Sequence, residues 1–208
     1  MILCFDFDGV IADSFTAVLA MSHTVEKQFS SKTRFSSEED FKTIKNLVWF
    51  DLGKSIGLTD ETAKEYSTEV FKAFKKLDST KIKIFPGIIE VIKELSKKHL
   101  LVIITSSQTD YVTSILKRED IYDCFIKIYD GTDGASKSVK IDRAINHLGV
   151  ERDTVFMIGD SQTDILEGKE AKVKTVAVNW GWQTRELLLG CNPDFVVESP
   201  RELLQILS

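Results

Sequence analysis

The alternation of short apolar runs with longer amphipathic stretches restricts the fold of this chain more than any other feature. Six apolar runs rich in β-branched residues are expected to be strands, at residues 2–7, 100–105, 124–128, 154–158, 174–178 and 194–197. Nearly every position in them is apolar, as is typical of strands buried on both faces of a parallel sheet. Amphipathic patterns predict helices at 88–97, 110–117, 139–148, 163–171 and 200–207. The sequence therefore predicts an α/β fold with a doubly wound parallel sheet, similar to a Rossmann fold.

Residues 14–80 interrupt this alternation. They contain no convincing strand, and their apolar spacing predicts helices, for example at 15–29 and 60–77. A turn signal, Phe-Pro-Gly at 85–87, marks the return of the βα pattern. We therefore expect an α/β core made of residues 1–13 and 81–208, with residues 14–80 inserted after the first strand as a helical cap domain.

Composition excludes several classes of protein. The 208 residues carry a formal net charge of −5, which argues against binding to nucleic acids or to anionic membranes. The three cysteines are odd in number and scattered, as expected for reduced thiols in the cytoplasm. The first residues lack the basic region of a signal peptide, and no apolar run is long enough to predict a transmembrane helix. We expect a cytoplasmic protein without a membrane or nucleic-acid partner.

The residues at the ends of the predicted strands carry most of the chemical information. Asp6 and Asp8 end the first strand and Thr105 ends the second. Lys137 lies near the start of a predicted helix after the third strand, and Asp160 and Asp164 follow the fourth. Because ligands of open α/β sheets bind beyond the carboxyl ends of the strands, we expect these side chains to converge.

Four converging carboxylates would repel one another unless a cation lay between them. Asp6 and Asp8 are two residues apart, so their side chains would point to the same side if the strand continued. Oxygen ligands of this kind suit Mg²⁺, and the candidate ligands are Asp6, Asp8, Asp160 and Asp164. Strand-end aspartates also cap helices and turns. That alternative explains one aspartate well, but it explains four in this order poorly.

The motifs resemble those of the haloacid dehalogenase-like hydrolase superfamily. The run DFDGVIADS at 6–14 is similar to its first motif, Thr105 to the second, and GDSQTD at 159–164 to the fourth. Phe-Pro-Gly at 85–87 and the segments 178–181 and 192–197 extend the resemblance to the phosphoglycolate phosphatase-like branch. The resemblance covers the α/β part of the chain. Residues 14–80 have the position and helical character of the small cap domain in that family.

The resemblance implies a mechanism that agrees with the chemistry of these residues. Asp6 would attack phosphorus and form an aspartyl-phosphate, and Asp8 would act as general acid and then general base. The Asp6 carboxylate, the Asp8 backbone carbonyl and Asp160 would hold Mg²⁺. Asp164 would orient the site or bind the metal through water.

The phosphoryl oxygens would be held by Thr105, Ser106 and Lys137. Gly9 is expected to place its backbone near the phosphate, although a simple turn would also explain it. Two lysines compete for the cationic role, because Lys137 and Lys140 are three residues apart on one predicted helix. Lys137 is favoured since it stands at the helix N-terminus, where an anion binds well, whereas Lys140 is expected to be solvated.

The activity implied is hydrolysis of a small phosphorylated metabolite, because Asp8 can protonate an oxygen leaving group. Phosphoglycolate, sugar phosphates, nucleotides and pyrophosphate are all candidate substrates. A phosphomutase on the same scaffold and a non-catalytic phospho-receiver or binding module are the alternatives.

In the insert, Lys42, Lys45 and Lys54 could reach a substrate carboxylate, but solvation is the simpler expectation. Trp49 and Trp182 are expected to pack within the core or the cap.

Overall fold

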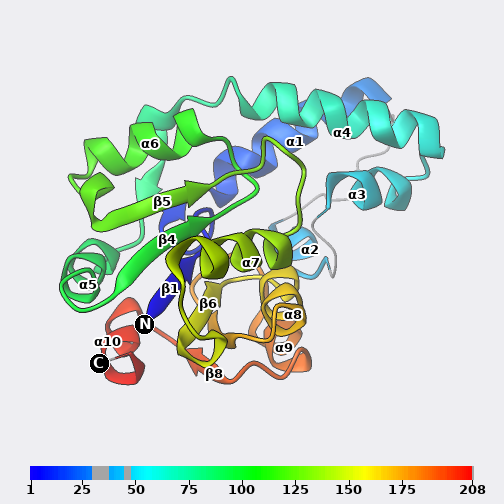
Figure 1. Ribbon diagram of the computed structural model, residues 1–208. Coiled ribbons are helices and arrows are strands. Elements are labelled where there is room, and N and C mark those ends of the chain that lie inside the picture. The colour runs from blue at the N-terminus through cyan, green and yellow to red at the C-terminus, as the bar shows by residue number, and fades with distance from the viewer. Residues whose placement is uncertain (30–37, 45–47, 208) are drawn as a thin grey trace.

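The computed structural model describes residues 1–29, 38–44 and 48–207 and confirms the α/β fold. A six-stranded parallel sheet runs through its centre in the order β5-β4-β1-β6-β7-β8 (Figure 1). The strands are β1 (Ile2–Phe5), β4 (Leu100–Ile104), β5 (Phe125–Tyr129), β6 (Val155–Gly159), β7 (Lys174–Val178) and β8 (Phe195–Val197). Each lies within two residues of a predicted run.

Helices cover both faces of the sheet. One face carries α5 (Ile88–Leu95), α6 (Thr109–Arg118) and α10 (Pro200–Ile206), and the other carries α7 (Lys137–Leu148), α8 (Gln162–Glu170) and α9 (Arg185–Gly190). Strand side chains alternate between the faces, so Leu3 and Phe5 pack on the first layer whereas Ile2 and Cys4 pack on the second. Burial on both faces explains why the strand sequences are almost continuously apolar.

The strand order fixes where a ligand can bind. If only the six strands of this sheet are numbered in chain order, their order in the sheet is 3-2-1-4-5-6. The chain therefore adds strands first on one side of β1 and then on the other. Such a reversal leaves a crevice at the carboxyl ends of the central strands. Here the central strands are β1, β4 and β6, which precede Asp6, Thr105 and Asp160, respectively.

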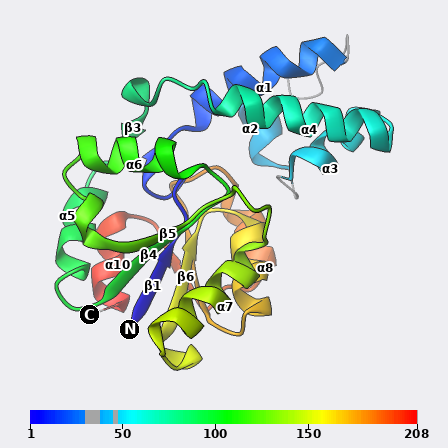
Figure 2. The same cartoon turned by 45° about the horizontal axis from the view of Figure 1, so that its top comes forward.

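The helices of the insert, residues 14–80, lie beyond one end of the sheet (Figure 2). They are α1 (Phe15–Phe29), α2 (Glu38–Lys42), α3 (Trp49–Ser55) and α4 (Asp60–Phe74). Their own apolar cluster includes Phe15, Val18, Leu52, Tyr66 and Val70. α4 begins at Asp60 because the Thr59 side chain accepts a hydrogen bond from the Thr62 N–H at 3.3 Å.

Two very short strands lie where the insert joins the sheet. β2 (Ala12–Asp13) pairs antiparallel with β3 (Lys83–Ile84). Strands of two residues carry no periodicity, so the sequence did not predict them. Three short 3₁₀ helices complete the described elements, η1 (Ser79–Lys81), η2 (Tyr122–Cys124) and η3 (Arg152–Thr154). None of the helices in the described part of the chain combines the length and apolarity needed to span a bilayer.

Candidate active site

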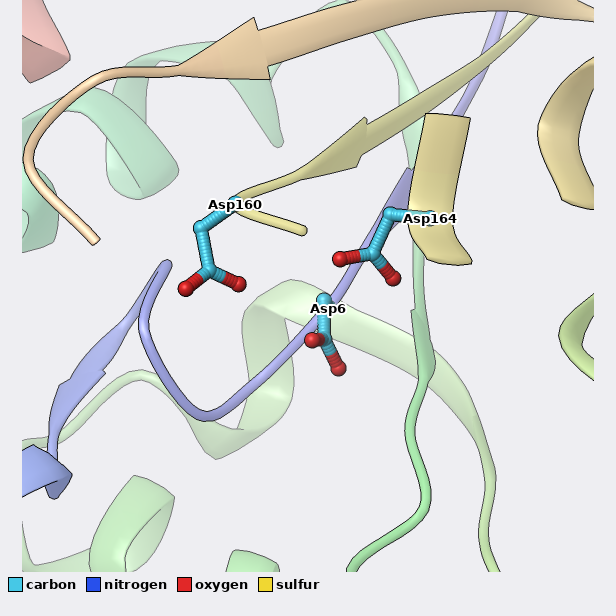
Figure 3. A group of neighbouring side chains, drawn as sticks. All are labelled: Asp6, Asp160 and Asp164. Carbon is cyan, nitrogen blue, oxygen red and sulfur yellow. The ribbon is translucent and has the colours of Figure 1, made fainter. Parts of the chain in front are cut away.

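Three buried carboxylates meet at the carboxyl ends of the central strands. Asp6 follows β1, Asp160 follows β6, and Asp164 lies in the first turn of α8. One oxygen of each lies within 4.8 Å of the others, and Figure 3 shows the three side chains gathered in one place at the ends of the strands. Burial raises the pKa of Asp160, and the nearby Asp164 and Asp6 carboxylates raise it further.

Local hydrogen bonds hold two of these carboxylates in place. The Ser161 hydroxyl accepts from the Asp164 N–H at 3.3 Å, and Asp164 Oδ2 accepts from the Ser161 N–H at 3.0 Å, which forms a capping box at the start of α8. Asp160 Oδ2 accepts from the Trp182 N–H at 2.6 Å. The GDSQTD sequence thus starts a helix and orients Asp164, whereas the Trp182 N–H orients Asp160.

Lys137 ties the first strand to this cluster. Its Nζ lies 2.8 Å from Asp6 Oδ2 and also donates to Asp164. Burial raises the pKa of Asp6 to about 7, although the Lys137 ammonium opposes the rise. Burial alone would lower the pKa of Lys137. The Asp164 and Asp6 carboxylates together have the larger effect, so the pKa of Lys137 lies above its ordinary value. Lys137 therefore remains a cation in the site.

Asp8 has a different environment. Its carboxylate lies outside the group of three and accepts from three hydroxyls: Ser14 at 2.5 Å, Tyr111 at 3.1 Å, and Ser107. Burial raises the pKa of Asp8, whereas the hydroxyls stabilise its ionised form. A buried acid with a raised pKa is suited to hold a proton and give it up during a reaction.

The side chains of Asp6 and Asp8 do not point to the same side, as they would if the strand continued through both residues. β1 ends at Phe5, so the condition for that expectation is not met. Asp6 contacts Lys137 of α7, whereas Asp8 contacts Tyr111 of α6 on the other face of the sheet. The two carboxylates therefore have separate sets of partners.

The expectation that Lys140 is solvated is wrong. Its side chain is buried, and its Nζ donates to the Thr105 carbonyl at 2.8 Å. Burial lowers the pKa of Lys140, and the charge of Lys137 lowers it further. The Thr105 hydroxyl accepts from the Ser107 N–H at 3.0 Å. Lys140 thus supports the Thr105 segment, whereas Lys137 contacts the carboxylates.

Two glycines let the backbone approach Asp160. Gly9 has φ of 85°, and a Cβ there would lie 2.0 Å from Asp160 Oδ2. A Cβ on Gly181 would lie 2.2 Å from the Asp160 Cβ. Any larger residue would displace the carboxylate. The sequence singled out Gly9 but not Gly181, because a loop glycine far along the chain gives no sign of what it approaches.

A cavity of about 410 Å³ opens in front of these groups. Its base includes Asp6, Asp8 and Asp160, the 105–108 segment and the start of α7. The insert contributes Val48, Trp49, Ser67, Phe71 and Phe74. Thr105, Ser106 and Lys137 all line the cavity, so most of the predicted phosphate-binding residues face one space.

The lysines singled out in the insert are engaged elsewhere. Lys54 Nζ pairs with Asp60 at 2.5 Å, and Lys42 Nζ lies 5.1 Å from the centre of the Phe15 ring. Neither lines the cavity. Lys45 lies outside the described residues.

Both tryptophans pack against the apolar cluster of the insert, as expected. Trp182 packs edge-on against Phe15 at 5.8 Å and Phe41 at 6.3 Å between ring centroids, as a packing residue would. Both Trp182 and Trp49 also line the cavity. The sequence pattern shows that such residues pack, but it does not show which open space they border.

Comparison with known proteins identifies relatives across the whole chain. Residues 3–178 match the family described as haloacid dehalogenase-like hydrolase. A phosphoglycolate phosphatase of Synechococcus elongatus is 24% identical over 98% of this chain and 95% of its own. The pyrophosphatase PpaX of Oceanobacillus iheyensis is also 24% identical, with the same coverage. A haloacid dehalogenase-like family hydrolase of Streptococcus pneumoniae has the same fold, with a TM-score of 0.86, 22% identity, and coverage of 100% of this chain and 98% of its own.

Proposed function

The chain belongs to the haloacid dehalogenase-like hydrolase family, and we propose that it is a Mg²⁺-dependent phosphatase that cleaves a small phosphate monoester through an aspartyl-phosphate. One observation carries the proposal: Asp6 and Asp8, with separate partners, line the same cavity beside Asp160. One carboxylate can attack while the other holds a proton.

The three clustered carboxylates fit a hard divalent cation. Asp6, Asp160 and Asp164 are buried and place oxygens within 4.8 Å of one another, with one lysine in contact. Mg²⁺ prefers such oxygen ligands and, when bound, stabilises negative charge on a phosphoryl group. Asp6 and Asp160 would hold it together with the predicted Asp8 carbonyl. Asp164 already accepts from Lys137 and Ser161, which supports an outer role in orienting the site.

The residues of this chain account for each step. An Asp6 oxygen attacks phosphorus, the phosphorus–oxygen ester bond breaks, and the Asp8 carboxyl gives its proton to the departing alcohol oxygen. Asp8, now ionised, accepts a proton from the water that attacks the aspartyl-phosphate. The Asp6–phosphorus bond then breaks, which releases inorganic phosphate and returns both carboxyls to their starting states.

The remaining residues bind and orient. Thr105, Ser106 and Lys137 would contact phosphoryl oxygens, and the Gly9 backbone would lie close to them. Ser14, Ser107 and Tyr111, through the Asp8 carboxylate, would position the acid. We also propose that residues 14–80 act as the cap domain, because their side chains close one side of the cavity.

The names of the relatives offer phosphoglycolate and pyrophosphate as substrates to be assayed. The three free cysteines support a reducing compartment, the cytoplasm.

The direct test is phosphate release from p-nitrophenyl phosphate with Mg²⁺ or with EDTA. We expect turnover only with Mg²⁺ and its loss in Asp160→Asn. Asp153→Asn, an exposed aspartate before the other end of β6, is the matched control and should retain wild-type turnover. Equal rates in Mg²⁺ and EDTA, or an active Asp160→Asn variant, would contradict the proposal. Retention of the phosphoryl group on a product alcohol would instead indicate a phosphomutase.

A further inference from the structure

We infer that the leaving group of the substrate carries a flat apolar ring and no negative charge of its own. This inference rests on the proposed phosphatase function and narrows it. It is based on the side of the cavity built by the insert, where Val48, Trp49, Phe71 and Phe74 form what we call the aromatic wall.

Part of the aromatic wall lies outside the packing of the insert: Trp49 and Phe74 pack against its apolar cluster, whereas Val48 and Phe71 are largely exposed. On α4, Ala63, Tyr66 and Val70 are buried among the other helices of the insert. Ser67, Phe71 and Phe74 have the i, i+4, i+7 spacing of a second stripe, and all three line the cavity. α4 therefore packs one apolar stripe within the insert, and its second stripe lines the cavity, with Phe74 contacting both.

Two residues of the aromatic wall have large exposed fractions. Phe71 is 42% exposed and Val48 is 47% exposed, although both are large apolar side chains. Exposed apolar side chains that gather around a concave space commonly mark a ligand-binding site. Phe74 is fixed by an edge-on contact with the Tyr111 ring at 5.3 Å, and the Tyr111 hydroxyl binds Asp8. The wall thus stands beside the proposed acid, where the leaving group must lie.

The charges around the cavity disfavour an anionic leaving group. Its charged lining residues are Asp6, Asp8, Asp160, Glu167, Lys137 and Lys140. Lys137 already pairs with two carboxylates, and Lys140 donates to the Thr105 carbonyl. Within the described part of the chain, the aromatic wall adds no charged side chain. A carboxylate or second phosphate against the apolar side chains of this wall would lose water without gaining a cationic partner among the described lining residues.

The size of the cavity points the same way. About 410 Å³ is within the range of sites that enclose drug-sized ligands. Phosphoglycolate and pyrophosphate are smaller than the ligands that a cavity of this volume encloses. An aromatic or heteroaromatic ring would fill it and would pack edge-on or offset against Phe71 and Trp49.

The test compares kcat/KM for benzyl phosphate, ethyl phosphate and phosphoglycolate. All three release a primary alcohol, so they differ mainly in what the alcohol carries: a ring, a methyl group or a carboxylate. We expect benzyl phosphate to exceed each of the others by about tenfold or more, the value of one well-packed aromatic contact.

Variants at Phe71 test whether the aromatic wall causes the expected preference for benzyl phosphate. Phe71→Ala should reduce kcat/KM for benzyl phosphate about tenfold and for ethyl phosphate less than threefold. Phe71→Arg should lower the benzyl value and raise the phosphoglycolate value, because it supplies a cation. Phe71→Leu keeps the apolar bulk but removes the ring. If the Phe71→Ala variant melts at a lower temperature than the wild-type protein, Phe71→Leu takes its place in the comparison. Tyr122→Ala and Tyr122→Arg, at an exposed aromatic residue before β5, are matched controls and should change none of the three values.

The outcomes separate this inference from the proposed function. Preferred hydrolysis of phosphoglycolate, or equal losses with all three esters in the Phe71 variants, would overturn the inference alone, provided that turnover still requires Mg²⁺ and Asp6. Absence of turnover of all three esters and of p-nitrophenyl phosphate would overturn the proposed function and the inference with it.

Discussion

The two sides of the cavity are built in different ways. On the sheet side, each reactive group has fixed polar partners: Asp8 has three hydroxyls, Asp160 a backbone N–H, and Lys137 two carboxylates. On the insert side, the aromatic wall offers apolar side chains, two of them more than 40% exposed. In the proposed function, the sheet side carries out the chemistry, and the insert side would contact the group that this chemistry releases.

Both sides carry a cost that a ligand relieves. Buried carboxylates that repel one another are stabilised by a cation, and exposed apolar side chains are stabilised by apolar contact. Departures from ordinary folding rules of this kind gather at functional sites. We therefore expect substitutions on the sheet side to change kcat/KM equally for all substrates. Substitutions in the aromatic wall should change kcat/KM for some substrates more than for others.

Asp6→Asn should have the largest effect. Removal of the nucleophile should lower kcat by on the order of 10⁴-fold or more, and equally for every ester. Steady-state phosphate release with p-nitrophenyl phosphate and benzyl phosphate checks both statements. A rate near wild type would remove Asp6 from the mechanism, and a loss confined to one ester would break the distinction between the two sides.

Asp8→Asn should reduce kcat by roughly 10²–10⁴-fold, the usual contribution of a positioned acid or base. The loss should be smaller for p-nitrophenyl phosphate than for ethyl phosphate, because nitrophenolate leaves without a proton. Parallel measurement of the two esters gives the ratio. An identical loss with both would argue that Asp8 orients the site without donating a proton.

The two lysines should differ. Lys137→Ala should lower kcat/KM by about 10²-fold, because it removes a preorganised charge next to Asp6. Lys140→Ala should lower it less, because the Lys140 ammonium contacts the Thr105 carbonyl and supports that segment from behind. Lys137→Arg and Lys140→Arg distinguish charge from shape. A larger loss in Lys140→Ala would transfer the cationic role to Lys140.

Metal binding should stabilise the fold in a pH-dependent way. Asp6 has a folded-state pKa of about 7 against an ordinary value of 3.8, so without metal the folded state holds this proton more tightly than the unfolded chain. The free energy of unfolding in EDTA should therefore fall as the pH rises from about 4 to about 7.

Mg²⁺ would bind the ionised carboxylates in the proposed site, so its stabilisation should grow over the same pH range and reach about 2.7 kcal/mol at 100 times Kd. Thermal melting in Mg²⁺ and in EDTA, across this range, measures it. Asp160→Asn should abolish the difference. Melting temperatures that do not respond to Mg²⁺ at pH 7.5 would contradict the metal site.

The smallest effect is expected at Lys54. Its ammonium pairs with Asp60 on the exterior of the insert and does not line the cavity, so Lys54→Ala should leave kcat/KM for every ester within about twofold. A selective loss with phosphoglycolate would show that this lysine reaches the substrate, and it would weaken the contrast between the two sides.

The sequence predicted the fold and the positions of the sheet residues because both depend on local information. Continuous apolar runs mark the strands, and the residues directly after a parallel strand lie at the ligand-binding edge. Asp6, Asp160 and Lys137 are each fixed by a strand end or a helix start nearby in the chain. Their positions therefore follow from short stretches of sequence around each of them.

Other features depend on contacts between distant residues, which periodicity does not encode. Tyr111 binds Asp8 across 103 positions, and Lys140 is buried because the Thr105 carbonyl accepts its hydrogen bond. Phe74 fits the apolar pattern of α4 as well as Tyr66 does, yet Phe74 also lines the cavity, whereas Tyr66 is buried within the insert. An apolar stripe shows that a side chain will be covered; it does not show whether protein or substrate covers it.

The most direct test of the account is to locate the phosphoryl group on the enzyme. Wild-type protein is mixed with Mg²⁺ and benzyl phosphate, quenched in acid within the first turnovers, digested, and analysed by mass spectrometry. We expect phosphate on the Asp6 carboxylate, and none on the protein in the Asp6→Asn variant treated in the same way. Phosphate on Asp8 or another residue, or turnover of wild-type enzyme with no phosphorylated peptide and no burst of alcohol release, would contradict it.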